Sequence, residues 1–102
     1  QLNVELKKSL YKTVVTLDKE GNLKRKDSNG NTFEYSLKDV KVVKSENDGY
    51  RNMMIHLEKG RKSNGVVEGK KVESELNVVA FANPNDCKKA ILLFKKLVEK
   101  YN

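Results

Sequence analysis

The chain has 102 residues, of which 37% are hydrophobic and 34% charged, and this size predicts one domain spanning residues 1–102. No segment approaches the ~20 consecutive apolar residues of a membrane-spanning helix, and a single cysteine, Cys87, excludes an internal disulfide. Cys87 and the single histidine, His56, are also too few for a zinc site, which uses about three or four protein ligands, so we expect no metal and no cofactor.

The net charge of +7 is unevenly distributed along the chain. Residues 1–45 carry ten basic and six acidic side chains, residues 83–102 carry five and two, and residues 46–82 are neutral. This charge is compatible with a nucleic-acid or anionic-membrane partner but does not require one.

The first part of the chain alternates between apolar and polar residues with the period of two that is typical of strands. This alternation predicts strands at residues 2–6, 11–17 and 23–27, and the last of these is polar enough for a sheet edge. Residues 19–22 read as a turn between strands. The Asn29-Gly30 pair predicts a tight hairpin turn at residues 28–31.

The same pattern continues beyond residue 31. Strands are predicted at residues 33–37 and from residue 40 to a turn at 45–49, and Met53, Ile55 and Leu57 mark the buried face of the next strand. Residues 59–69 contain three glycines and read as a long hairpin loop. Residues 72–81 form the last predicted strand, with Leu76, Val78 and Ala80 on one face.

The period changes after residue 82 and predicts a helix at residues 84–101. Asn83 is suited to the N-cap, Pro84 to the first helical position and Asp86 to the first turn. Apolar residues then recur at spacings of three and four, which predicts one buried stripe. Its members are Cys87, Ala90, Ile91, Phe94, Leu97, Val98 and Tyr101.

Six to seven antiparallel strands at about residues 2–82, followed by one amphipathic helix, predict a mainly-β α+β fold. This order, with the segments 35–40 and 78–81, resembles the pleckstrin-homology-like superfamily. The resemblance implies a partly open barrel or two near-orthogonal sheets, capped at one end by the terminal helix. The phosphoinositide-binding members usually carry a tryptophan in that helix, and this chain contains none.

Basic residues flank the first predicted hairpin, where phosphoinositide-binding members of the superfamily place theirs. They are Lys12, Lys24, Arg25 and Lys26, and they form the candidate binding site for an anion such as a lipid headgroup or nucleic acid. The alternative is a solvated edge strand, on which lysines prevent strand-to-strand aggregation.

Other chemistry-bearing residues have simpler interpretations. His56 is expected at the surface, Cys87 as a packed and unreactive thiol, and Glu73 and Glu75 on a solvated sheet face rather than as an acid–base pair. Tyr50 and Arg51 are the one candidate for an exposed aromatic beside a basic residue, as a nucleic-acid stacking platform would need. Without a catalytic constellation, we expect the protein not to be an enzyme.

Two function hypotheses remain. The first is a binding or interaction module that takes a protein or peptide partner along a groove between the helix and an exposed strand, by strand addition. The alternative is anion binding through the basic hairpin. The chain starts at Gln1 rather than Met, which is expected either for an exported protein after removal of a signal peptide, the explanation we favour, or for a domain of a longer protein.

Overall fold

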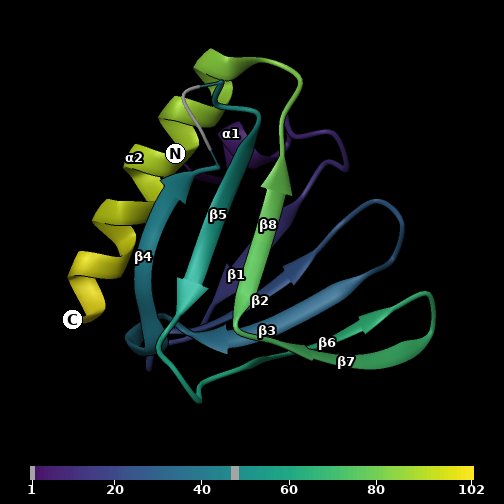
Figure 1. The fold of residues 1–102 in the computed structure, drawn as a ribbon, viewed down its shortest axis with the longest axis vertical. Coiled ribbons are helices and arrows are strands. Elements are labelled where there is room, and N and C mark those ends of the chain that lie inside the picture. The colour runs from purple at the N-terminus through teal and green to yellow at the C-terminus, as the bar shows by residue number, and fades with distance from the viewer. Residues whose placement is uncertain (1, 47–48) are drawn as a thin grey trace.

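The computed structural model describes residues 2–46 and 49–102, which form two antiparallel sheets and a C-terminal helix (Figure 1). The five-stranded sheet has the order β1-β2-β3-β6-β7 and the three-stranded sheet the order β4-β5-β8. The strands are β1 (Val14–Leu17), β2 (Asn22–Lys26), β3 (Thr32–Ser36), β4 (Val40–Ser45), β5 (Asn52–Leu57), β6 (Ser63–Val67), β7 (Lys70–Ser74) and β8 (Leu76–Ala80). The helices are α1 (Leu2–Leu6), the 3-10 turn η1 (Leu37–Asp39) and α2 (Pro84–Tyr101).

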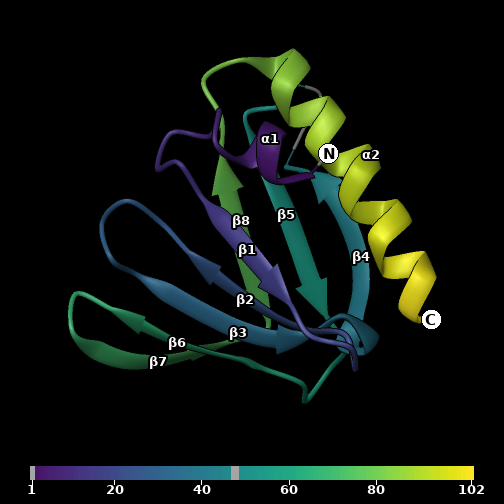
Figure 2. The ribbon, with the colours of Figure 1, turned by 180° about the vertical axis from the view of Figure 1, so that it is seen from behind.

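The mainly-β α+β fold predicted from the sequence is therefore confirmed, with eight described strands in place of six or seven. The strands of the described residues do not close into a barrel. The three-stranded sheet stands in front of β1 and β2 in Figure 1, and the order is reversed in Figure 2, while α2 runs alongside β4 in both views. In the described part of the chain, no helix is long and apolar enough to cross a membrane.

The hydrophobic core lies where the inner faces of the two sheets meet α2. It contains buried side chains from both sheets, from η1 and from both α-helices. The largest of them are Phe81, Phe94, Leu6, Leu23, Leu37, Met53 and Ile55. Met53, Ile55 and Leu57 are all buried, as the alternation in that strand predicts.

Helix α2 begins and ends where the sequence predicts. The Asn83 side chain accepts a hydrogen bond from the Asn85 backbone N–H at 2.8 Å, so it caps the helix, and Pro84 follows at the first position. The four stripe residues Cys87, Ala90, Ile91 and Phe94 are buried, and Leu97, Val98 and Tyr101 pack partly buried against them. The helix thus buries one face and leaves its lysines in solvent.

The predicted strand at residues 2–6 is wrong, because this segment is the short helix α1. Leu2 and Leu6 are four residues apart and so share a helix face, and Leu6 is fully buried. The Asn3 side chain makes two hydrogen bonds to the backbone of Val15, accepting its N–H at 2.9 Å and donating to its C=O at 3.0 Å. Asn3 therefore occupies the outer edge of β1 as a neighbouring strand would.

The long loop predicted at residues 59–69 is also wrong, since Ser63–Val67 forms β6 and pairs with both β3 and β7. Gly65 lies opposite Phe33, and a Cβ at position 65 would come within 2.5 Å of the Phe33 ring. Gly65, which the sequence suggests is a loop residue, is in fact a strand residue whose missing side chain leaves room for the Phe33 ring.

The single strand predicted at residues 72–81 is two strands in different sheets. The strand is interrupted at Glu75. There the Ser74 hydroxyl donates a hydrogen bond to the C=O of Leu76 at 2.7 Å and accepts one from the Leu76 N–H at 3.0 Å. Beyond this turn Leu76, Val78 and Ala80 share one face, as predicted, and the buried residues of the strand are Asn77 and Val79 on the other face.

A bulge in β4 also changes which side chains are buried. The register shifts between Val40 and Val42, so Val43 joins Val40 in the core and Val42 faces solvent. The predicted turn at 45–49 includes residues 47 and 48, which lie outside the described residues, as does Gln1.

Candidate functional site

A groove runs between α2 and the outer edge of β4, and we call it the α2–β4 groove. It is lined by residues 40–43 of the strand and by Lys95, Val98 and Glu99 of the helix, and its volume is about 230 Å³. Within the described strands, β4 has β5 as its single neighbour, so its other edge has no strand paired to it, and α2 runs alongside β4 in both views (Figures 1 and 2). Sheet edges of this kind present backbone N–H and C=O groups in a row.

The side chains of this groove combine an apolar floor with a charged rim. Val42 is exposed, Val98 is half-buried, and both lie beside the buried Val40 and Val43. Lys41 and Lys95 are exposed, as is Glu99. The rim is therefore more basic than acidic.

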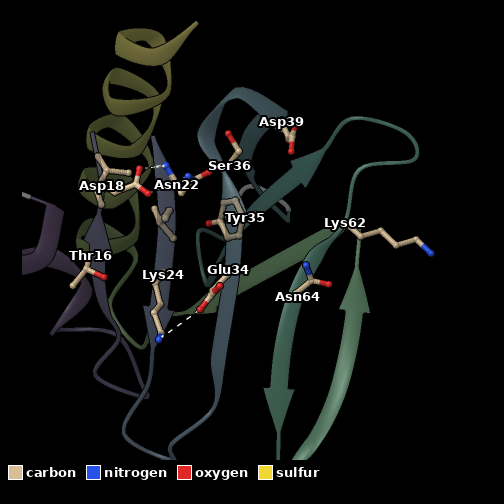
Figure 3. Close-up of a pocket in the computed structure, with 12 residues that line it drawn as sticks. Thr16, Asp18, Asn22, Lys24, Glu34, Tyr35, Ser36, Asp39, Lys62 and Asn64 are labelled. Atoms are coloured by element: carbon tan, nitrogen blue, oxygen red, sulfur yellow. Dashed lines mark hydrogen bonds and ion pairs between the residues drawn. The ribbon is translucent and has the colours of Figure 1, made fainter. Parts of the chain in front are cut away.

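The largest hollow, about 690 Å³, lies on the outer face of the five-stranded sheet (Figure 3). Across it the strand register places Thr16, Lys24, Glu34 and Asn64 in one row. The Lys24 ammonium lies 3.5 Å from the Glu34 carboxylate. At one end Asp18 accepts hydrogen bonds from the backbone and side chain of Asn22, and these bonds lower the pKa of the Asp18 carboxyl.

The remaining charged groups of this hollow also have partners. Asp39 lies 3.8 Å from Arg61 and Lys62 lies 3.9 Å from Glu73. Charges that neutralise one another across a solvated sheet face attract a ligand weakly. The volume of this hollow alone therefore does not make it the binding site.

The four predicted anion-binding residues do not lie on one surface. Lys12, Lys24 and Lys26 line a hollow of about 320 Å³ that also includes Asp27, and we call it the lysine hollow. Arg25 alternates to the opposite face of β2 and is buried, with 6% of its surface exposed. The inward position of Arg25 follows from the period of two in β2, because neighbouring strand residues point to opposite faces of the sheet.

The other singled-out residues differ in outcome. Cys87 is buried, as predicted, and burial raises the pKa of its thiol. His56 is half-buried rather than at the surface, and its Nε2 atom is buried without a hydrogen-bond partner. Tyr50 packs against the core and carries the Lys88 ammonium 4.7 Å from its ring centre, so it offers no open stacking face beside Arg51.

Glu73 and Glu75 are both exposed, as expected for a solvated face, and the strand ends between them. Across residues 2–46 and 49–102, no three His, Cys, Asp or Glu side chains are grouped so that they could hold a metal ion.

No protein-family model matches the chain, and no curated protein or solved structure has significant similarity to it. The geometry of its own residues therefore carries the functional argument.

The sequence pattern did not single out the individual residues of the α2–β4 groove. Lys41, Lys95 and Glu99 read as ordinary solvent-facing positions, because each lies off the apolar pattern of its own element, and Val42 reads only as part of a strand with Val40. Their juxtaposition depends on which strand lies at the sheet edge beside the helix, and a single sequence carries no local signal for that.

Proposed function

We propose that this chain is a binding module that takes an extended peptide segment at the edge of β4, in the α2–β4 groove. The observation that carries the proposal is an edge strand lying directly beside an amphipathic helix with a groove between them. In such a site the strand edge supplies backbone hydrogen bonds, and the groove beside it supplies side-chain selectivity. The proposal also draws on the resemblance of the element order to the pleckstrin-homology-like superfamily.

The other sheet edges are less suited to this role. The edge of β1 is occupied by the Asn3 side chain at Val15. The end of β8 is held by the Leu10 N–H, which donates to the C=O of Ala80 at 2.9 Å. Strand β7 contributes no fully buried side chain and has no helix beside it to form a groove. These comparisons favour β4.

The groove also indicates the chemistry of its partner. Val42 and Val98 favour an apolar or β-branched side chain on the peptide face that points into the groove. Lys41 and Lys95 favour acidic residues at the ends of the segment, and the neighbouring lysines of α2 strengthen the positive field. We therefore expect an extended, β-branched segment flanked by Asp or Glu.

The proposal can be tested by NMR titration of the full chain with a short Val/Thr-rich peptide that has acidic ends. We expect saturable amide shifts at residues 40–43 of β4 and at Lys95 and Glu99 of α2. The matched control peptide carries methyl groups on alternate backbone nitrogens, which remove the N–H donors of strand pairing without changing the side chains. Equal shifts from both peptides, or shifts confined to other elements, would contradict strand addition at β4.

A charge-reversal variant tests the partner chemistry at the same site. Lys41→Glu with Lys95→Glu should weaken binding of the acidic peptide about three- to thirtyfold, since two solvated ion pairs are replaced by repulsion. The matched control is Lys70→Glu with Lys71→Glu on β7, which makes the same change in net charge away from the groove. If the control weakens binding as much, the peptide responds to overall charge and not to the groove.

The alternative function is anion binding at the lysine hollow, and the convergence of Lys12, Lys24 and Lys26 on one surface favours it. The ion pair between Lys24 and Glu34 and the presence of Asp27 weaken the local positive field. Co-sedimentation with phosphoinositide-containing vesicles should then fall steeply between about 50 and 200 mM salt and be lost in Lys12→Ser/Lys26→Ser. Unchanged sedimentation by that variant would remove the lysine hollow as the anion site.

A further inference from the structure

A second cavity lies between the two sheets, on the side of the molecule away from the α2–β4 groove. It has a volume of about 280 Å³ and is bounded by β8 on one side and by the inner faces of β2 and β3 on the other. The residues that bear on its chemistry are Arg25, Asp27, Phe33, Leu76, Asn77 and Val78. We call it the inter-sheet cavity.

The Arg25 side chain is a buried cation that makes no direct ion pair, although the Asp27 carboxylate lies near enough to act on its charge. Arg25 is 6% exposed, and its guanidinium lies 5.1 Å from the centre of the Phe33 ring. Its Nε is buried without a hydrogen-bond partner, and the guanidinium forms no ion pair with a carboxylate of residues 2–46 or 49–102. Burial lowers the pKa of this guanidinium, but an arginine remains charged at neutral pH.

Such an arrangement is costly for the protein alone. Removing a charge from water is strongly unfavourable unless the charge is paired and hydrogen-bonded. The planar guanidinium also has five N–H donors arranged to bind a carboxylate through two parallel hydrogen bonds. Arg25 is therefore held ready for an anion from outside the chain.

Asn77 supplies a second unpartnered group in the same cavity, and it is an acceptor. Asn77 is 3% exposed, and its Nδ2 donates a hydrogen bond to the Ser63 hydroxyl at 2.8 Å. The Ser63 hydroxyl in turn donates to the C=O of Ser74 at 3.1 Å, which fixes the amide orientation of Asn77. The Oδ1 atom is left buried without a partner, so the cavity calls for an N–H or O–H donor there.

Asp27 limits which anions fit beside Arg25. Asp27 is 8% exposed. One of its carboxylate oxygens accepts hydrogen bonds from the backbone N–H groups of Asn29 and Asn31, at 2.9 and 3.1 Å. The formal charges of Arg25 and Asp27 cancel, so a phosphate with two negative charges is disfavoured. A ligand with one negative charge and a nearby donor is favoured.

Apart from Tyr11 and Asn31, the rest of the lining is apolar. Phe33, Leu76 and Val78 contribute most of it and present carbon atoms to the space between the sheets. An aliphatic side chain in contact with them would gain free energy from burial.

We propose that the inter-sheet cavity binds a residue with a free α-carboxylate, a neighbouring amide N–H and an aliphatic side chain. The carboxylate pairs with Arg25, the N–H donates to the Oδ1 of Asn77, and the side chain lies against Phe33 and Leu76. This chemistry occurs in an N-acylated amino acid and in the last residue of a peptide. The proposal is independent of peptide binding at the α2–β4 groove, because the two sites share no residue.

The test is an NMR titration of the full chain with N-acetyl-leucine, following the Nε–Hε signals of arginine. We expect a saturable shift of the Arg25 signal, while the exposed Arg51 and Arg61 serve as internal references. N-acetyl-leucinamide, which lacks the carboxylate, should leave all three signals in place. An unmoved Arg25 signal, or the same shift with the amide, would overturn the proposal.

Two variants extend the test without depending on each other. Arg25→Met lacks the arginine signal, so its binding is followed through the backbone amide signals of Asn77 and Val78. It should weaken binding roughly tenfold to a hundredfold, as expected for loss of a charge-assisted hydrogen bond. If that variant does not fold, Val78→Glu places a negative charge on an exposed position at the cavity and should weaken binding as well. Val66→Glu, equally exposed on another face, is its matched control and should bind as the wild type does.

A further arm identifies the source of the carboxylate. Binding of N-acetyl-leucine is compared with binding of a short peptide that ends in leucine with a free carboxyl group. Tighter binding of the peptide supports the cavity and assigns it to a chain terminus, and equal binding supports it and assigns it to a small molecule. Failure of both ligands to shift the Arg25 signal would refute the site.

Discussion

The contact between Gly21 and Tyr101 allows a quantitative prediction about how the last turn of α2 is held. Gly21 has a φ of +89°, and a Cβ built there would lie 2.7 Å from Cδ1 and 3.1 Å from Cγ of the Tyr101 ring. Gly60 has a similar φ of +83° but has open space where a Cβ would be. Comparing alanine substitutions at Gly21 and Gly60 thus separates the cost of the backbone conformation from the cost of overpacking against the Tyr101 ring.

Alanine at either position must adopt the left-handed conformation, which costs about 1–2 kcal/mol. Gly60→Ala should lose only this amount. Gly21→Ala should lose about 1–3 kcal/mol more, because the new methyl group overpacks the base of the Tyr101 ring. A domain of this size has a total stability of roughly 5–15 kcal/mol, so both variants are expected to fold.

Urea unfolding followed by far-ultraviolet circular dichroism measures both losses. In the Tyr101→Ala background the extra cost of Gly21→Ala should disappear, while the cost of Gly60→Ala should not change. Equal losses for the two alanine variants, or an extra cost that persists without the tyrosine ring, would refute the packing argument.

Three further predictions concern the core, the thiol and acid stability. Phe94→Ala should destabilise the protein by about 3–5 kcal/mol in urea unfolding, because the ring is fully buried under α2, and a loss below about 1 kcal/mol would contradict that placement. Burial raises the pKa of Cys87, so a thiol reagent should label it slowly in the native protein and rapidly in urea; fast native labelling would show an open site. Hydrogen bonds from Asn22 lower the pKa of the Asp18 carboxyl in the folded protein. The contribution of Asp18 to stability is therefore complete above the ordinary carboxyl pKa, and it is lost as the pH falls through the lowered pKa of the folded state. The melting-temperature difference between the wild type and Asp18→Asn should therefore shrink in acid, and a difference that stays constant would count against this linkage.

Those parts of the fold whose signals are local could be predicted from the sequence. Helix α2 has a capping side chain, a proline at its first position and an apolar stripe from Cys87 to Tyr101, and these signals all act within the helix. Strand β5 alternates over six residues with large apolar side chains on one face. Both elements bury the face that their pattern indicates.

The errors arose where a local pattern fits two structures or where tertiary contacts decide. Five alternating residues also fit a single helical turn, which is how Leu2–Leu6 folds. The Ser74 hydroxyl ends one strand and starts the next within an unbroken alternating run. Gly65 reads as a loop residue because the Phe33 ring that requires it lies in another strand.

The candidate sites were harder to predict than the fold. The basic run at residues 24–26 predicts one anion-binding surface, but neighbouring strand residues point to opposite faces and Arg25 points inward. The α2–β4 groove and the inter-sheet cavity both depend on how strands are ordered in the sheets. That order is set by long-range pairing, which the residue pattern of one chain does not contain.

The hairpin of β6 and β7 has a practical use that follows from its position. Strand β7 buries no side chain completely, and a Cβ built at Gly69, in the turn between β6 and β7, would meet open space. Surface turns of this kind tolerate insertions well. An epitope tag or a fluorophore-binding sequence placed in this turn should report on the protein in cells or on a sensor surface while leaving the α2–β4 groove accessible, since the two share no residue.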